Sequence, residues 1–174
     1  MNEENTKISQ IQEKIIQSHG RKIEEQEEVQ ECLSFLLGEE MYSFNTQCIK
    51  EIILISKIYP VPATPDYLTG IINLRGEILP VVDLKKILGL QDATLDENAR
   101  IVIAEGRFKI CFLADFIIDI VHIPVTDIQP PISTIEKTKV DYFDGEVLLG
   151  EDLLGILNLD KIIDSEYLKE PSKI

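Results

Sequence analysis

"DYLTGIINLRGEILPVVDLKKIL", residues Asp66 to Leu88, is matched 75 positions later by "DYFDGEVLLGEDLLGILNLDKII", residues Asp141 to Ile163. Eight of the 23 aligned positions are identical without a gap, whereas ordinary residue frequencies would give roughly one or two. Asp83 aligns with Asn158, and both residue types cap the N-terminus of a helix. The pair predicts the same short helix in both segments, and Gly89 provides a stop for the first one.

The repeat continues upstream at an offset of 68, where "IKEIILI" (Ile49–Ile55) matches "IIDIVHI" (Ile117–Ile123). At this offset Gly38 aligns with Gly106, and Phe44 with Phe112. The offset grows by seven, from 68 to 75, so the second copy carries an insertion near "PVTDIQPPISTIEKTK". The sequence therefore predicts a tandem duplication, with copies at about residues 32–90 and 100–165.

Short runs rich in branched residues fill both copies, among them "CLSFLL", "EILPVV", "RIVIAE" and "KICFLA". Glycine, proline or acidic residues separate the runs, a pattern that favours β-strands. One copy of about 60 residues would bury only about 60% of its unfolded surface and be marginally stable alone. We therefore expect a mainly β protein with short helices, in which two small barrels share a core and leave no open strand edges.

The composition excludes several classes of function. The net charge of −14 over 174 residues argues against nucleic acid or anionic membranes as partners, because phosphates require a basic face. No apolar stretch approaches the length of a membrane span, and no secretory signal is apparent. Cys32, Cys48 and Cys111 are far apart and form no CxxC pair, which is typical of buried, reduced thiols in a cytoplasmic protein.

Residues 1–30 differ from the rest of the chain. Ile8, Ile11 and Ile15 follow helical spacing, and the acidic run "EEQEEVQE" comes next. A helix this short is marginal alone, so we expect a mobile, partly helical extension that docks on another surface and adds little to folding. A disordered tail without function is the alternative.

The duplication provides an internal control for Arg75, which lies at the turn between two apolar runs. Gly76 supplies the positive φ angle that a tight hairpin needs. The second copy has Gly150 in place of Arg75, so the fold does not require the arginine. We therefore predict that Arg75 has a specific function. Glu51 aligns with the acidic Asp119, so it serves either as a structural partner or as a binding residue.

An enzyme would need a catalytic constellation, and the sequence offers weak candidates. His19 and His122 are far apart, and their spacing suggests neither a metal site nor a proton relay. Asp115 and Asp119 share one face of a predicted strand and are best interpreted as solvated carboxylates. The chain has no glycine-rich phosphate loop and no Gly-x-Ser-x-Gly elbow. A binding module is therefore favoured over an enzyme, with no metal and no cofactor.

The stretch "IKEIILISKIYPVPATPDYLTGIINLRGEILPVVDLKKILGL" resembles the core of the CheW-type coupling proteins of bacterial chemosensory arrays. Its Glu51-Ile52, Asn73-Leu74-Arg75-Gly76 and Asp83-Leu84 fall on that family's recurrent positions. The second half matches more loosely, since Cys111 and Ala114 stand where glycine and valine are usual. The resemblance covers about residues 32–165.

This resemblance implies two five-stranded SH3-like barrels in a domain at residues 31–170. It also implies a non-catalytic, cytoplasmic scaffold, recruited to membrane receptor arrays, that joins a chemoreceptor tip to the regulatory domain of a CheA-type histidine kinase. The kinase would meet the outer faces of the barrels. A chemosensory pathway that controls pili or development is the alternative. The partner-binding residues implied by the resemblance are Ile49, Glu51, Gly70, Asn73, Arg75, Gly76 and Ile120.

Overall fold

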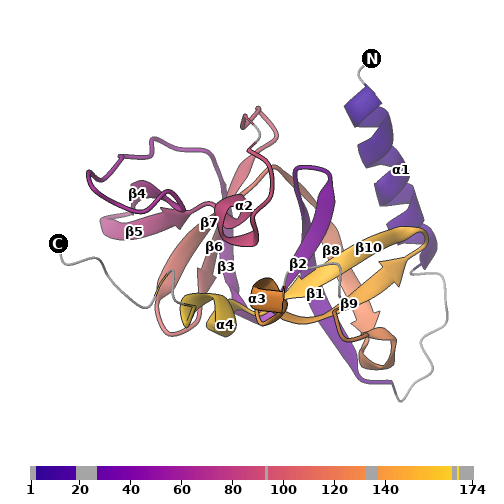
Figure 1. The fold of residues 1–174 in the computed structure, drawn as a ribbon. Helices are drawn as coiled ribbons and strands as arrows, with labels where there is room; N and C mark the ends of the chain where they lie inside the picture. Colours follow the sequence, from indigo (N-terminus) through magenta and orange to yellow (C-terminus); the bar gives the residue numbers. More distant parts are fainter. Residues whose placement is uncertain (1–2, 19–26, 93, 132–136, 166–167, 169–174) are drawn as a thin grey trace.

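The computed structural model of the chain describes residues 3–18, 27–92, 94–131, 137–165 and 168. These residues form a mainly β structure with a few helices (Figure 1), as the sequence predicts. In chain order the elements are α1 (Glu3–Ser18), β1 (Val29–Leu37), β2 (Glu40–Asn45), η1 (Thr46–Cys48), β3 (Ile49–Leu54), β4 (Leu68–Leu74), β5 (Glu77–Val82), α2 (Leu84–Leu88), β6 (Arg100–Glu105), β7 (Lys109–Ala114), β8 (Phe116–Pro124), η2 (Val125–Asp127), α3 (Lys137–Val140), β9 (Phe143–Leu149), β10 (Asp152–Leu157) and α4 (Leu159–Ile163).

The strands form two five-stranded sheets. Sheet A has the order β8-β1-β2-β10-β9, and sheet B has the order β3-β6-β7-β5-β4. Most neighbouring strands are antiparallel, but β5 pairs with β7, and β10 with β2, in parallel. The two parallel pairs are equivalent under the sequence repeat, because Val82 faces Phe112 in one and Leu157 faces Phe44 in the other.

The sheets do not coincide with the sequence copies 32–90 and 100–165. Sheet A combines β1 and β2 of the first copy with β8, β9 and β10 of the second, and sheet B has the reciprocal composition. This exchange differs from the sequence-based expectation of one barrel per copy. The physical reason for the exchange of strands is burial, because a single copy of about 60 residues cannot enclose enough apolar surface. With the strands exchanged, each sheet contains strands of both copies.

The two predicted helix caps are confirmed. The Asp83 side chain accepts a hydrogen bond from the amide of Lys85 at 2.9 Å, and Asn158 accepts one from the amide of Lys161 at 2.9 Å. Gly89 ends α2 with a φ of 68°, a left-handed conformation that glycine adopts without a steric cost. The helix α4 ends instead at Asp164 in a right-handed conformation.

Three clusters of buried apolar side chains form the core. The first fills the space between the sheets and includes Phe44, Phe112 and residues of α2 and α4. The second belongs to sheet A and includes Leu154 and Ile156, and the third belongs to sheet B. The shared first cluster agrees with the expectation that the two copies pack on one another.

The N-terminal helix is docked on sheet A, so the surface that the partly helical extension contacts belongs to this chain. Ile11 and Ile15 are 7% and 1% exposed and belong to the core cluster of that sheet. The helix packs against β8 and β9, and it lies along this side of the molecule in Figure 1. Residues 19–26, which contain the start of the acidic run, lie outside the described residues. Because α1 buries two isoleucines, it contributes to the core.

Lys85 and Asp115 form a buried ion pair between α2 and the bend that separates β7 from β8. The side chain of Lys85 is 2% exposed, and its Nζ lies 2.7 Å from Oδ1 of Asp115. The amide of Gly38 donates to Oδ2 of the same carboxylate at 2.6 Å. Asp115 is therefore a structural residue and not the solvated strand carboxylate expected from the sequence, whereas Asp119 is exposed on β8.

Candidate partner-binding site

The hairpin between β4 and β5 places Arg75 at its tip. Arg75 and Gly76 occupy the two turn positions, with φ angles of 52° and 89°, and two positive φ angles are characteristic of a type I′ turn. The side-chain oxygen of Asn73 accepts a hydrogen bond from the amide of Gly76 at 2.8 Å. Asn73 therefore stabilises the turn that presents Arg75.

The backbone of Arg75 is in a conformation that disfavours an arginine. A side chain with a Cβ in the left-handed region costs roughly 1–2 kcal/mol relative to ordinary helical or extended backbone. The equivalent Gly150 has a φ of 68° and avoids this cost. The sequence indicated that Gly76 alone supplies the positive φ, but Arg75 supplies one as well. The turn would be less strained with glycine at position 75. The reason for an arginine there is therefore a role of its side chain and not a requirement of the backbone.

The Arg75 guanidinium binds the Glu51 carboxylate through two hydrogen bonds. Nη1 lies 3.0 Å from Oε2, and Nη2 lies 2.7 Å from Oε1. Glu51 is on β3, so the pair connects the hairpin tip to the opposite edge strand of sheet B. The arginine side chain is 75% exposed, and exposed ion pairs contribute about 0–1 kcal/mol to stability. The pair therefore fixes the orientation of two charged groups without contributing much to the fold.

Large apolar side chains are exposed on the same elements. On β3, Ile52 and Leu54 are exposed next to Glu51, and on β5 Ile78 is exposed opposite Asn73. Exposed apolar residues on the same strands as an oriented charged pair are a typical composition of a protein interface. This combination can provide a binding surface, since Glu51 and Arg75 offer both an acceptor and donors.

Gly70 is explained by packing within the fold. A Cβ at this position would lie 2.4 Å from the carbonyl oxygen of Tyr59, in the segment that bridges to β4. The equivalent Gly145 has the same environment, because its Cβ would lie 2.6 Å from the carbonyl oxygen of Gln129. Because both Gly70 and the equivalent Gly145 are required by this close packing, Gly70 is explained by the fold that the two copies share.

Ile49 and Ile120 lie apart from the charged pair. Ile49 is half-buried at the start of β3 and packs against the shared core cluster. Ile120 is 45% exposed, but it is on β8 of sheet A. The structure therefore brings Glu51, Asn73, Arg75 and Gly76 together, places Gly70 near the start of β4, and leaves Ile120 on the other sheet.

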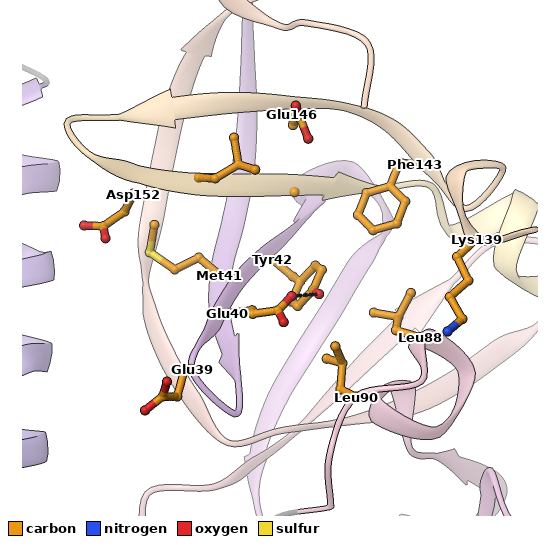
Figure 2. A pocket seen from close by; sticks show the side chains of 12 residues that line it. Glu39, Glu40, Met41, Tyr42, Leu88, Leu90, Lys139, Phe143, Glu146 and Asp152 are labelled. Carbon is orange, nitrogen blue, oxygen red and sulfur yellow. Dashed lines mark hydrogen bonds between the residues drawn. The ribbon is translucent and has the colours of Figure 1, made fainter. Parts of the chain in front are cut away.

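A cavity of about 550 Å³ that the sequence did not indicate lies beside β2, β10 and the end of α2 (Figure 2). Leu88, Leu90 and Phe143 provide apolar walls, and the Tyr42 hydroxyl donates a hydrogen bond to Oε2 of Glu40 at 2.5 Å. Burial raises the pKa of the Tyr42 hydroxyl above its usual value, so this group stays protonated and cannot act as a base. The residues that line this cavity come from separate strands, helices and loops and share no motif.

The cysteine thiols are held in their protonated form, in which they are poor nucleophiles. Burial raises the pKa of Cys48 to about 11 and that of Cys111 to about 12, which keeps both thiols protonated at neutral pH. Cys32 and Cys111 are buried, as expected, and Cys48 is half-buried. Within the described ranges no group of three or more His, Cys, Asp or Glu side chains is arranged to hold a metal ion. In the same ranges, every helix is too short or too polar to cross a bilayer.

Comparison with known proteins identifies relatives over most of the chain. The model of the CheW-like domain matches residues 31–167. The chain is 30% identical to the chemotaxis protein CheW of Treponema pallidum, over 79% of this chain and 84% of that protein. It is 33% identical to the CheW of Thermotoga maritima, over 80% and 91% of the two chains. The crystal structure of the scaffolding protein TtCheW from Thermoanaerobacter tengcongensis superposes with a TM-score of 0.72 at 28% identity, covering 80% of this chain and 96% of that one.

Proposed function

The chain belongs to the CheW-like domain family, and we propose from this premise that it couples a chemoreceptor tip to the regulatory domain of a CheA-type histidine kinase. Its family makes it a non-catalytic chemotaxis adaptor of the scaffolding kind. The identities of its two partners and the surfaces that bind them are the proposal. The protein would act in the cytoplasm, recruited to receptor arrays at the membrane.

The receptor site is proposed on sheet B, around Glu51 and Arg75. The observation that carries this assignment is the strained backbone of Arg75, whose φ of 52° occurs where the second copy has glycine. Arginine offers five donors in a rigid fork and is well suited to carboxylates and to carbonyls at the end of a helix. Asn73 and Gly76 stabilise the turn between β4 and β5. Ile49 and Gly70 pack within β3 and β4, the strands that position Glu51 and the hairpin.

Ile120 belongs to a second, repeat-related surface in this proposal. It aligns with Ile52 at the offset of 68, and both side chains are exposed. Ile52 follows Glu51 in β3, and Ile120 follows Asp119 in β8, where the Asp119 carboxylate accepts a hydrogen bond from the amide of Ile120 at 2.7 Å. We therefore assign Ile120 to contacts made by sheet A.

The test is binding of a receptor cytoplasmic-tip fragment and of the kinase regulatory domain to the full chain and to Arg75→Gly. We expect the receptor affinity to fall at least tenfold, which corresponds to about 1.4 kcal/mol. Affinity for the kinase domain should change less. Unchanged receptor binding by folded Arg75→Gly would place the receptor surface elsewhere.

Arg107 provides a matched control. It is also an exposed arginine in a turn, and its Nη2 lies 2.7 Å from Oδ1 of Asp164. Arg107→Gly removes a comparable surface ion pair at a different place on the molecule. Receptor binding should be unchanged in this variant if the effect of Arg75 is local.

A further inference from the structure

The helix α1 covers one end of sheet A, and it lies outside the residues 31–167 that match the family domain. Ile11 and Ile15 of the helix join a cluster with Met41, Ile118 and Leu154. The tandem duplication supplies an equivalent end on sheet B, so the two ends can be compared residue by residue.

The first comparison concerns a cross-strand pair. In sheet A, Leu36 pairs with Met41 across β1 and β2, and in sheet B the equivalent pair is Glu105 with Lys109 across β6 and β7. Met41 is 5% exposed beneath α1, whereas Lys109 is partly exposed to solvent. The same place in the fold is therefore apolar in one sheet and charged in the other.

The second comparison concerns a β-bulge. The pairing of β3 with β6 skips Lys50, and the pairing of β8 with β1 skips the aligned residue Ile118. Lys50 forms a 3.0 Å ion pair with Glu105, while Ile118 is 7% exposed in the cluster that contains Ile11 and Ile15. A bulged residue leaves the regular ladder of strand hydrogen bonds. Of these two bulges, only the one at Ile118 in sheet A carries an apolar side chain.

The third comparison concerns the partner of an acidic residue at the start of an aligned strand. Glu77 of β5 pairs with Lys109 of its own sheet at 2.8 Å. The aligned Asp152 of β10 pairs with Lys14 of α1 at 3.3 Å. In sheet A the helix thus supplies the cation that sheet B supplies from its own strand.

Two features of α1 favour its release from the sheet. A helix of 16 residues is marginal in isolation, and among its described side chains the ion pairs of Lys7 with Glu39 and of Lys14 with Asp152 are both exposed. A cavity of about 270 Å³ remains between the first turns of α1 and the segment around Asp96 and Asn98. Because packing is incomplete and the ion pairs are exposed, undocking of α1 requires less free energy than unfolding of the sheets.

We propose that α1 is a displaceable cap over an apolar interaction face of sheet A, and that the kinase regulatory domain occupies this face when α1 leaves. The face comprises Leu36, Met41, Phe116 and Ile118, with Glu39 and Asp152 at its rim. Its occupant must therefore present an apolar surface flanked by basic side chains, as α1 does with Lys7 and Lys14. The identity of the partner rests on the proposed coupling function, whereas the cap rests on the comparison of the two sheets.

The test compares binding of the kinase regulatory domain to the full chain, to Ile11→Asp/Ile15→Asp, and to the control Ser9→Asp/Gln10→Asp. Both double variants add two negative charges to α1, but Ser9 and Gln10 are exposed. We expect the isoleucine variant to bind the kinase domain at least tenfold more tightly than the parent, and the control to bind like the parent. Equal or weaker binding by the folded isoleucine variant would overturn the cap.

Hydrogen exchange on the unmodified chain gives a second test that does not depend on the folding of a variant. Addition of the kinase domain should raise the exchange rates of the α1 amides, while β1 and β8 stay protected. Unchanged or greater protection of α1 in the complex would overturn the cap while leaving the coupling function intact. Failure of every form of the chain to bind the kinase domain would instead overturn the coupling function.

Discussion

The rings of Phe44 and Phe112 stack with their centroids 5.2 Å apart at an angle of 25°. The two residues occupy equivalent positions in the two sequence copies, and both are at most 1% exposed. Phe44 lies in β2 of sheet A and Phe112 in β7 of sheet B. A residue of one copy therefore packs against its own counterpart at the centre of the shared core.

Truncation of this contact should destabilise both sheets together. Phe112→Ala removes a fully buried aromatic ring, for which the typical cost is about 3–5 kcal/mol. Because each sheet contains strands of both copies, denaturant unfolding followed by circular dichroism should show one transition in parent and variant. Two separate transitions would show that the sheets unfold independently.

Arg75 and Gly150 should respond in opposite directions when their residue types change. Arg75→Gly relieves a left-handed conformation, so we expect stability to be unchanged or to rise by up to about 1 kcal/mol. Gly150→Ala places a Cβ at a φ of 68° and should lower stability by about 1 kcal/mol. Thermal melts of the two variants measure this difference. A large loss of stability in Arg75→Gly would mean that the pair with Glu51 is structural.

Gly70→Ala and Gly145→Ala should both destabilise the fold strongly. Each new Cβ would lie within 2.6 Å of a backbone carbonyl oxygen, and backbone cannot move as easily as a side chain. Gly76→Ala is the matched control, because its φ is positive but no heavy atom lies within 4 Å of the added Cβ. Urea unfolding should show a smaller loss for the control than for the other two. Equal losses in Gly70→Ala and Gly76→Ala would indicate that the positive φ, which these two positions share, sets the cost.

Asp115→Ala should cost about 3–5 kcal/mol, because it leaves the buried Lys85 ammonium without its charge partner. The double variant Asp115→Ala/Lys85→Met should recover much of that loss. Lys50→Ala breaks an exposed pair with Glu105 and should cost no more than about 1 kcal/mol. Denaturant titration of the set checks the order of the three losses. If the double variant is as unstable as Asp115→Ala, the loss does not come from a stranded charge.

Local patterns in the sequence determined the strands, the duplication and the caps of the short helices. Hydrophobic runs, turn glycines and the residues Asp83 and Asn158 act on their near neighbours, so their effect can be predicted from position alone. The motif around Asn73, Arg75 and Gly76 indicated the family for the same reason. It is a continuous stretch, so the motif can be recognised without knowing which distant residues it contacts.

Only the tertiary structure decided which strands pair, where α1 docks and which charges meet. The exchange of β1 and β2 between the copies, the ion pair of Lys85 with Asp115, and the burial of Ile15 each join residues far apart in the chain. Periodicity assigns a side chain to a face but does not specify the surface that covers that face. A strand edge or an apolar stripe can be satisfied by many partners, and the choice is made by the arrangement that buries the most apolar area with the fewest unpaired polar groups.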